Sequence, residues 1–240
     1  MTRSVKGILA LLAAALLAAV AASPSRAGTC GAGSYSYAGV GSRTATSGVG
    51  ATIRPTAAPN VRDGHVAGWI GVGGVGAGRS GMDEWIQIGL TASPGDTTSR
   101  IYYEIARPGR SPVYRELSHR VRVGEQHRFA VLELANRPGW WRVSLDGLPV
   151  SAPVFLAGSH ASWSAQVVGE SAGGETSGAC NLYAYGFGDV SLASALSGAW
   201  GPVGPFQLFQ DPFYRLVRSS ATSFVARSVA TPARLPVSTP

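Results

Sequence analysis

Apolar and polar residues alternate over short stretches along much of this chain, and Gly, Pro and Asp bound most of those stretches. Side chains alternate between the two faces of a β-strand, so this period of two is typical of strands. No long helical period follows the first 27 residues. The pattern predicts an all-β, single-domain antiparallel β-sandwich or jelly roll. The expected strands include "HVAGWIGVGG", "DEWIQIGLTA", "RIYYEIARP", "HRVRVGE", "HRFAVLELA", "WWRVSLDG", "SAQVVGES" and "NLYAYGFGDVSLA".

The same alternation sorts the expected strands into two faces. Ile86, Ile88 and Leu90 share one face of their strand, whereas Trp85 and Gln87 share the other. If the strands are neighbours in one sheet, an aliphatic surface faces the core and a second surface holds aromatic and polar side chains. An aromatic groove with a few polar groups binds ligands; the alternative is the ordinary wet face of an antiparallel sheet. The second surface holds Trp69, Trp85, Gln87, Tyr102, Glu104, Gln166 and Glu170.

The first 27 residues predict export. Two positive residues precede a long apolar run, and small residues end at Ala27, as in a secretory signal peptide. The run is short and rich in alanine for a membrane span, although an anchor is the alternative. We therefore expect residues 1–27 to be a signal peptide, a secreted, extracellular mature chain, and no membrane association after cleavage.

Composition divides the remaining chain into three parts. Residues 28–59 are rich in Gly, Ala and Ser and form an N-terminal segment; the alternative is a leader that is later cut, although Cys30 favours a start that stays attached. Residues 60–195 hold the strand patterns and form the predicted β-sandwich domain. Residues 196–240 form a C-terminal extension whose end we expect to be disordered. Its aromatic stretch, Phe206 to Tyr214, is expected to dock on the domain.

Charge and cysteine content limit the possible partners. Loss of residues 1–27 removes three positive residues and lowers the formal charge from +7 to +4. The arginines that remain are scattered, so we expect no nucleic-acid partner. In an exported chain, Cys30 and Cys180 most simply form one disulfide. The four histidines show no ligand spacing, so we expect no metal and no cofactor.

Five short stretches, in order, resemble the glutamic peptidases of the eqolisin type. "GWIGVGG" is similar to the family's Trp-Val-Gly-Ile-Asp-Gly segment, "WIQIGL" to its Leu-Gln-Thr-Gly-Val strand, and "YYEI" to its Trp-Tyr-Glu-Trp segment. "AQVVGES" resembles its Ala-Glu-Trp-Ile-Val-Glu-Asp strand, and "YGFGDVSLASA" resembles its last strand. Together these stretches span residues 66 to 195.

The resemblance implies a concanavalin A-like sandwich with catalysis on the concave face. It implies a catalytic dyad of Gln87 and Glu170, and it places Trp69, Tyr102 and Glu104 near the substrate groove. The chain departs from the family at two acidic positions, which are Gly73 and Gln166 here, and Tyr102 stands where the family has Trp.

These observations predict a secreted, glutamic-peptidase-like endopeptidase that is active in acid, with Glu170 as general base and Gln87 as oxyanion donor. Trp69, Trp85 and Tyr102 would bind side chains of an extended polypeptide, with Glu104 and Gln166 beside them. We expect a monomer. One alternative is a non-catalytic carbohydrate- or cell-wall-binding module on the same sandwich. Another is a structural or interaction protein whose 206–214 stretch fills the groove, where it could also be autoinhibitory.

Overall fold

The computed structural model describes residues 31–174, 180–196, 198–202, 204 and 206–229. The predicted signal peptide, Cys30 and residues 230–240 lie outside the described residues. Over the described ranges, the regular structure consists of β-strands and one short 3-10 turn, η1 (Arg79–Gly81). No helix in these ranges is long and apolar enough to cross a membrane.

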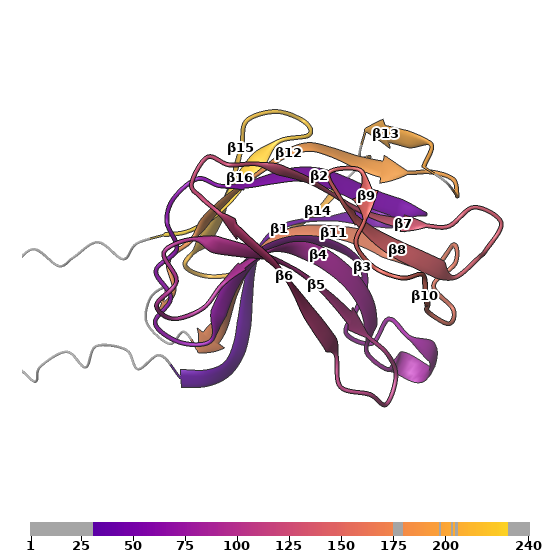
Figure 1. Ribbon diagram of the computed structural model, residues 1–240, viewed down its shortest axis with the longest axis horizontal. Coiled ribbons are helices and arrows are strands. Elements are labelled where there is room, and N and C mark those ends of the chain that lie inside the picture. The colour runs from indigo at the N-terminus through magenta and orange to yellow at the C-terminus, as the bar shows by residue number, and fades with distance from the viewer. Residues whose placement is uncertain (1–30, 175–179, 197, 203, 205, 230–240) are drawn as a thin grey trace, which may run out of the picture.

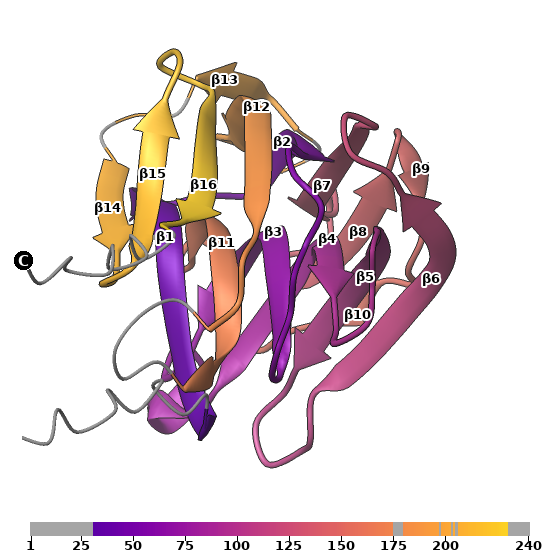
Figure 2. The same ribbon diagram turned by 90° about the vertical axis from the view of Figure 1, so that its left-hand side faces the viewer.

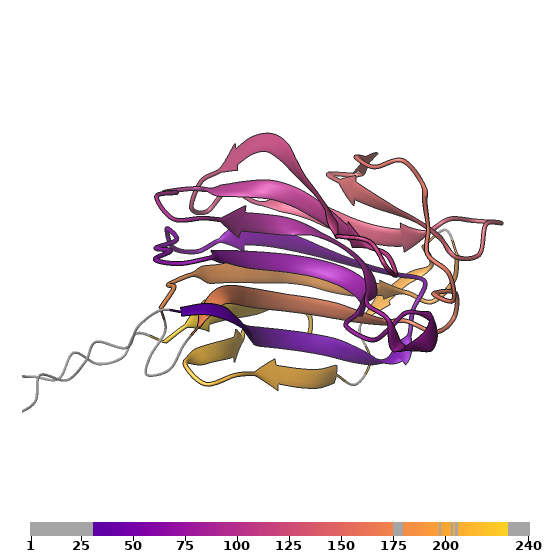
Figure 3. The same ribbon diagram turned by 90° about the horizontal axis from the view of Figure 1, so that it is seen from below.

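One antiparallel sheet carries the site and is called here the groove sheet. Its spatial order is β14-β1-β11-β3-β4-β5-β6, and Figure 3 shows these strands side by side. The bounds are β1 (Gly31–Ala45), β3 (His65–Gly74), β4 (Glu84–Ala92), β5 (Ser99–Ala106), β6 (Val113–Val121), β11 (Ser164–Gly174) and β14 (Phe206–Gln210).

The second sheet lies behind the first and is called the back sheet. Its main order is β10-β8-β7-β2-β12-β16-β15; β9 pairs with β8 and β13 with β12. Figure 1 shows the two layers stacked, which confirms the predicted antiparallel sandwich. The bounds are β2 (Gly48–Pro55), β7 (His127–Glu133), β8 (Trp140–Leu145), β9 (Leu148–Pro149), β10 (Val154–Phe155), β12 (Ala184–Ala193), β13 (Trp200–Pro202), β15 (Tyr214–Arg218) and β16 (Phe224–Ser228).

The core fills the space between the sheets. Every second residue of β4 enters it, and Ile86, Ile88 and Leu90 are fully buried there, as their alternation predicts. Phe129 and Trp141 enter it from the back sheet. Burial of each such side chain stabilises the fold by about 1.5–3 kcal/mol. The opposite face of the groove sheet is therefore left for the site.

The predicted domain boundaries, 60 and 195, are too narrow on both sides. The Gly-rich segment forms two long strands, with β1 in the groove sheet and β2 central in the back sheet. Its small residues lowered its strand signal, but they are required by close packing: a Cβ at Gly39 would lie 2.3 Å from the Val167 carbonyl oxygen. At the other end, the extension supplies β13 to β16.

The C-terminal strands join both sheets and are not a separate tail. In Figure 2, β14 lies beside β1, and β16 lies beside β12. Tyr214 and Phe224 are buried in the main core. The alternative in which the 206–214 stretch fills the groove does not describe this structure, because β14 pairs edge to edge with β1 and extends the sheet, so that only Phe209 of this stretch lines the cavity.

Candidate active site

The exposed face of the groove sheet holds a cavity of about 710 Å³. Aromatic side chains from several strands wall it, and polar side chains stand on its floor. Its lining includes the predicted site residues Trp69, Trp85, Gln87, Glu104, Gln166 and Glu170, together with Tyr35, Tyr37, His65 and Phe209. Tyr102 does not line the cavity; it is buried in a small cluster with Trp69 and Val168.

A polar row crosses the floor of the cavity from strand to strand. Gln166 pairs with Gly71, Gly71 pairs with Gln87, and Gln87 pairs with Glu104. These cross-strand partners project their side chains on the same face. Gly71 leaves the space between the two glutamines open; a Cβ there would lie 2.9 Å from that of Gln87. The row places one amide and one carboxyl group side by side in the cavity.

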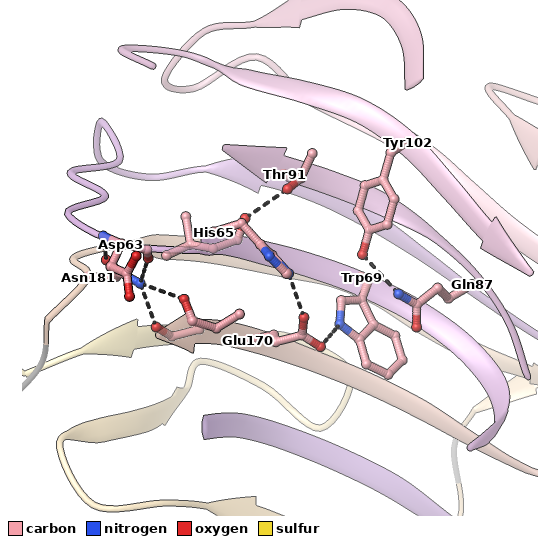
Figure 4. Close-up of polar contacts among 11 residues, drawn as sticks. Asp63, His65, Trp69, Gln87, Thr91, Tyr102, Glu170 and Asn181 are labelled. Carbon is pink, nitrogen blue, oxygen red and sulfur yellow. Dashed lines mark hydrogen bonds and ion pairs between the residues drawn. The ribbon is translucent and has the colours of Figure 1, made fainter. Parts of the chain in front are cut away.

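Gln87 is held in place by Tyr102. It is 8% exposed, and its Nε2 donates to the Tyr102 hydroxyl over 3.1 Å (Figure 4). Burial raises the pKa of Tyr102 well above its ordinary value, so the hydroxyl stays protonated. A primary amide has two N–H donors, and Tyr102 uses one of them. The second is therefore available to a ligand in the cavity.

Glu170 belongs to a different cluster. The indole Nε1 of Trp69 donates to its Oε2 over 2.9 Å, and His65 Nε2 lies 3.0 Å from its Oε1. Among the described residues, no hydrogen bond joins Glu170 to Gln87, and Figure 4 shows Trp69 between them. The geometry therefore does not bring the two residues of the predicted dyad into direct contact.

Glu104 stands half-buried beside Gln87. Burial is the main cause that raises the pKa of its carboxyl group above the ordinary value, and the charge of Glu170 raises it further. His65 and Trp85 offset part of that shift. The Trp85 indole N–H points toward the Glu104 carboxyl group and lowers its pKa, although the two groups do not form a hydrogen bond of ordinary geometry.

Gln166 and Gly73, which stand at the two acidic positions of the family pattern, meet at one end of the cavity. Gln166 Nε2 donates to the Gly73 carbonyl oxygen over 2.9 Å. Gly73 has a φ of +86°, and a Cβ there would lie 2.4 Å from the Glu84 carbonyl oxygen. An aspartate at this position would therefore be strained in this chain.

Sequence reasoning missed one wall of the cavity. Tyr35 and Tyr37 stack with ring centroids 6.3 Å apart, and the Tyr35 ring meets His65 edge-on. Phe209 comes from β14. These tyrosines lie outside the predicted domain, although their spacing of two in "SYSYA" was a strand signal. Phe209 belongs to the aromatic 206–214 stretch that was expected to dock on the domain, but only the pairing of β14 with β1 shows that it reaches the cavity.

Solved structures show which known proteins share this fold. A scytalido-glutamic peptidase bound to a peptide-based transition state analog superposes with a TM-score of 0.57 and 17% identity, covering 81% of this chain and 98% of that one. SCP-B, an eqolisin-family peptidase in complex with the tripeptide Ala-Ile-His, gives 0.54 and 16%, with the same coverage. This chain has the fold of the glutamic peptidases. No protein-family model matches the sequence, and no curated protein matches it.

The side chains that line the cavity of this chain include amide groups and carboxyl groups. The ranges that the structure describes contain no group of three His, Cys, Asp or Glu side chains arranged to hold a metal ion. The available groups can hydrogen-bond a backbone and transfer a proton.

Proposed function

We propose that this chain hydrolyses peptide bonds in an extended polypeptide that lies in the cavity of the groove sheet. The observation that carries the proposal is the pairing of Gln87 with a neighbouring carboxyl group on the floor of a 710 Å³ cavity with aromatic walls. The fold supports it, because the superposed peptidase structures hold a peptide-based transition state analog or a tripeptide.

Peptide hydrolysis needs a base that removes a proton from the attacking water and a hydrogen-bond donor that stabilises the oxyanion. The unused N–H of Gln87 is the proposed oxyanion donor, already oriented by Tyr102. A carboxylate in the cavity removes a proton from water and later returns it to the leaving nitrogen. The sequence-based hypothesis gives this role to Glu170. The aromatic walls, Trp69 and Trp85 among them, would pack against substrate side chains.

The remaining sequence expectations complete the proposal. We propose an exported, monomeric enzyme without cofactor, stabilised by a Cys30–Cys180 disulfide. Cys180 is buried just before β12, while Cys30 lies outside the described residues. Gly31, the next residue, pairs with Gly174 of β11, which supports a covalent link at that end of the sheet.

The test is digestion of an unfolded protein by the chain from residue 28 onward, between about pH 2 and pH 8. Mass spectrometry of the products should show new chain ends, and Gln87→Ala should lower kcat about 10²–10³-fold. Gln207→Ala is the matched control, because Gln207 is exposed on β14 and does not line the cavity. It should leave the rate unchanged.

Two results would overturn the proposal. One is a folded wild type that cleaves nothing across this range. The other is a Gln87→Ala variant that is as active as the Gln207→Ala control. Binding of a soluble polysaccharide in the cavity without any hydrolysis would instead support the alternative, a carbohydrate-binding module.

A further inference from the structure

We propose that the outer face of the back sheet binds a linear acidic polysaccharide whose sugars carry uronic acid carboxylates. This binding function is separate from the hydrolysis proposed for the cavity of the groove sheet and does not depend on it. It follows from the side chains that the back sheet turns away from the core. We call this surface the arginine face, and it consists of Arg54, Arg128, Arg142, Trp200, Arg215 and Arg227.

Alternation along each strand sends these arginines outward. In β2, Ile53 is fully buried in the core, so Arg54 points to the opposite side. In β16, Ala226 enters the core, so Arg227 points outward, and it pairs across the sheet with Arg215 of β15. Figure 1 shows no further layer of the described chain outside the back sheet. Arginines that are scattered along the sequence therefore share one uncovered face.

The side chains at the centre of the arginine face lie close to the backbone of the sheet. A Cβ at Gly50 of β2 would lie 2.8 Å from Nη2 of Arg128 and 3.4 Å from the indole ring of Trp200. A Cβ at Gly186 of β12 would lie 3.3 Å from Nε of Arg54. A guanidinium group and an indole ring therefore lie beside each other over one glycine.

One arginine of the face is fixed in place, and the others keep their donors. Arg128 donates to the Asp189 carbonyl oxygen over 2.8 Å and to the Ser191 hydroxyl over 2.9 Å, which orients its guanidinium group. The remaining N–H groups of Arg128 can reach a ligand, because a guanidinium group has five. Three exposed arginines of the face form no hydrogen bond or ion pair with another described side chain, and these are Arg54, Arg215 and Arg227.

The two outer faces of the sandwich differ in charge. On the groove sheet, Arg100 is paired with Asp96 at 2.7 Å and with Glu116 at 2.9 Å, and the described residues that line the cavity include carboxylates but no arginine. On the arginine face, Asp189 at the bulge of β12 is the acidic residue whose charge acts on Arg128. The arginine face thus carries excess positive charge, which attracts a polyanion.

The combination of arginine with an open indole favours an acidic sugar. A planar guanidinium group matches a carboxylate through two parallel N–H donors. The indole of Trp200 is 41% exposed, and an exposed aromatic ring can pack against the apolar face of a sugar ring. Arg128 and Trp200 together therefore offer one carboxylate contact and one ring contact to a single uronic acid unit. The exposed arginines would bind further units of the same polymer.

Fluorescence anisotropy of a labelled oligogalacturonate, titrated with the chain from residue 28 onward, tests the proposal. The wild type should bind it, more weakly as salt is added, and should not bind a neutral maltooligosaccharide of the same length. The double variant Arg54→Gln, Arg227→Gln should raise Kd roughly tenfold or more. Trp200→Ala should raise Kd about 2–10-fold.

A second double variant controls for net charge. Arg115→Gln combined with Arg122→Gln removes the same charge at β6, the opposite edge strand of the groove sheet, where both arginines are exposed. It should leave Kd unchanged. Circular dichroism of each variant confirms that a loss of binding is not a loss of folding.

Three results would overturn the proposal. They are a folded wild type that does not bind the oligogalacturonate, an equal loss of affinity in the two double variants, and equal or tighter binding of a single-stranded DNA oligomer of the same charge or of phosphatidylserine vesicles. Hydrolysis of an unfolded protein by the Arg54→Gln, Arg227→Gln variant should match the wild type. Failure of the polysaccharide proposal is therefore distinguishable from failure of the proposed function.

Discussion

At the scale of single residues, alternation predicted which side of each strand faces the site. Gln87 is the clearest example: a buried amide without partners costs about 1–3 kcal/mol, so a glutamine among isoleucines had to have a polar environment. The structure gives it Tyr102 and the cavity. Alternation carries no information on register, so the sequence could not show that Glu104, and not Glu170, is the partner of Gln87 across the sheet.

Replacing Glu104 should stabilise the fold at neutral pH. The raised pKa of Glu104 means that the folded chain binds its proton more tightly than the unfolded chain. This contribution to stability is full at low pH and is lost as pH rises through the raised pKa. Glu104→Gln should therefore be more stable than wild type at pH 7, with the difference closing in acid.

Urea unfolding at about pH 3 and about pH 7 measures that difference. Glu116→Gln, which removes an exposed carboxylate paired with Arg100, should show no such gain. If the free energy of unfolding depends on pH equally in wild type and Glu104→Gln, the pKa of Glu104 is not raised by folding.

The hydrogen bond from Trp69 to Glu170 should contribute measurably to stability. Trp69→Phe keeps an aromatic ring but removes the donor to a buried carboxylate, which should cost about 1–3 kcal/mol. Chemical denaturation compares it with Trp200→Phe, an exposed indole on β13. A loss no larger than in Trp200→Phe would show that Glu170 does not depend on this donor.

At the scale of elements, the strands with bulky alternating residues were predictable and the glycine-rich ones were not. β3, β4 and β5 lie where the sequence places them, whereas β1 and β2 lie in the Gly-, Ala- and Ser-rich segment that was left outside the predicted domain. Glycine normally weakens a strand, but this sheet uses it for close approach. In β4, a Cβ at Gly89 would lie 2.2 Å from the Gly68 carbonyl oxygen and 2.6 Å from the Trp69 Cα.

Gly89→Ala should therefore be poorly tolerated. The atoms that meet the added methyl group belong to the backbone of β3 and cannot rotate away, so overpacking should cost about 1–3 kcal/mol or more. Gly201→Ala on β13 is the control, because nothing lies within 4 Å of its added Cβ. If the two variants unfold at the same temperature, β3 and β4 are not as closely packed as described.

At the scale of the whole molecule, the sequence predicted a β-sandwich but not which residues at the two ends of the chain belong to it. Strand patterns with turn signals indicate two packed sheets. They do not show that the last strands of the chain pair with the edge strands of both sheets. β14 extends the groove sheet while β15 and β16 extend the back sheet. The cavity wall formed by Tyr37 and Phe209 depends on the pairing of β14 with β1.

Core contacts of the C-terminal strands should be essential for folding. Tyr214 is 2% exposed and stacks on Tyr183 with ring centroids 5.6 Å apart, so Tyr214→Ala should cost about 3–5 kcal/mol. Val217→Ala, at a 44% exposed position of the same strand, is the control and should change little. Equal stability of both variants would mean that the extension does not complete the core.

The measurement that tests the central claim most directly is digestion of an unfolded protein by the purified mature chain in mild acid, with Gln87→Ala beside it. The account predicts new peptide ends from the wild type and about 10²–10³-fold fewer from the folded variant. A folded wild type that produces no new ends would contradict the claim that this cavity hydrolyses peptide bonds.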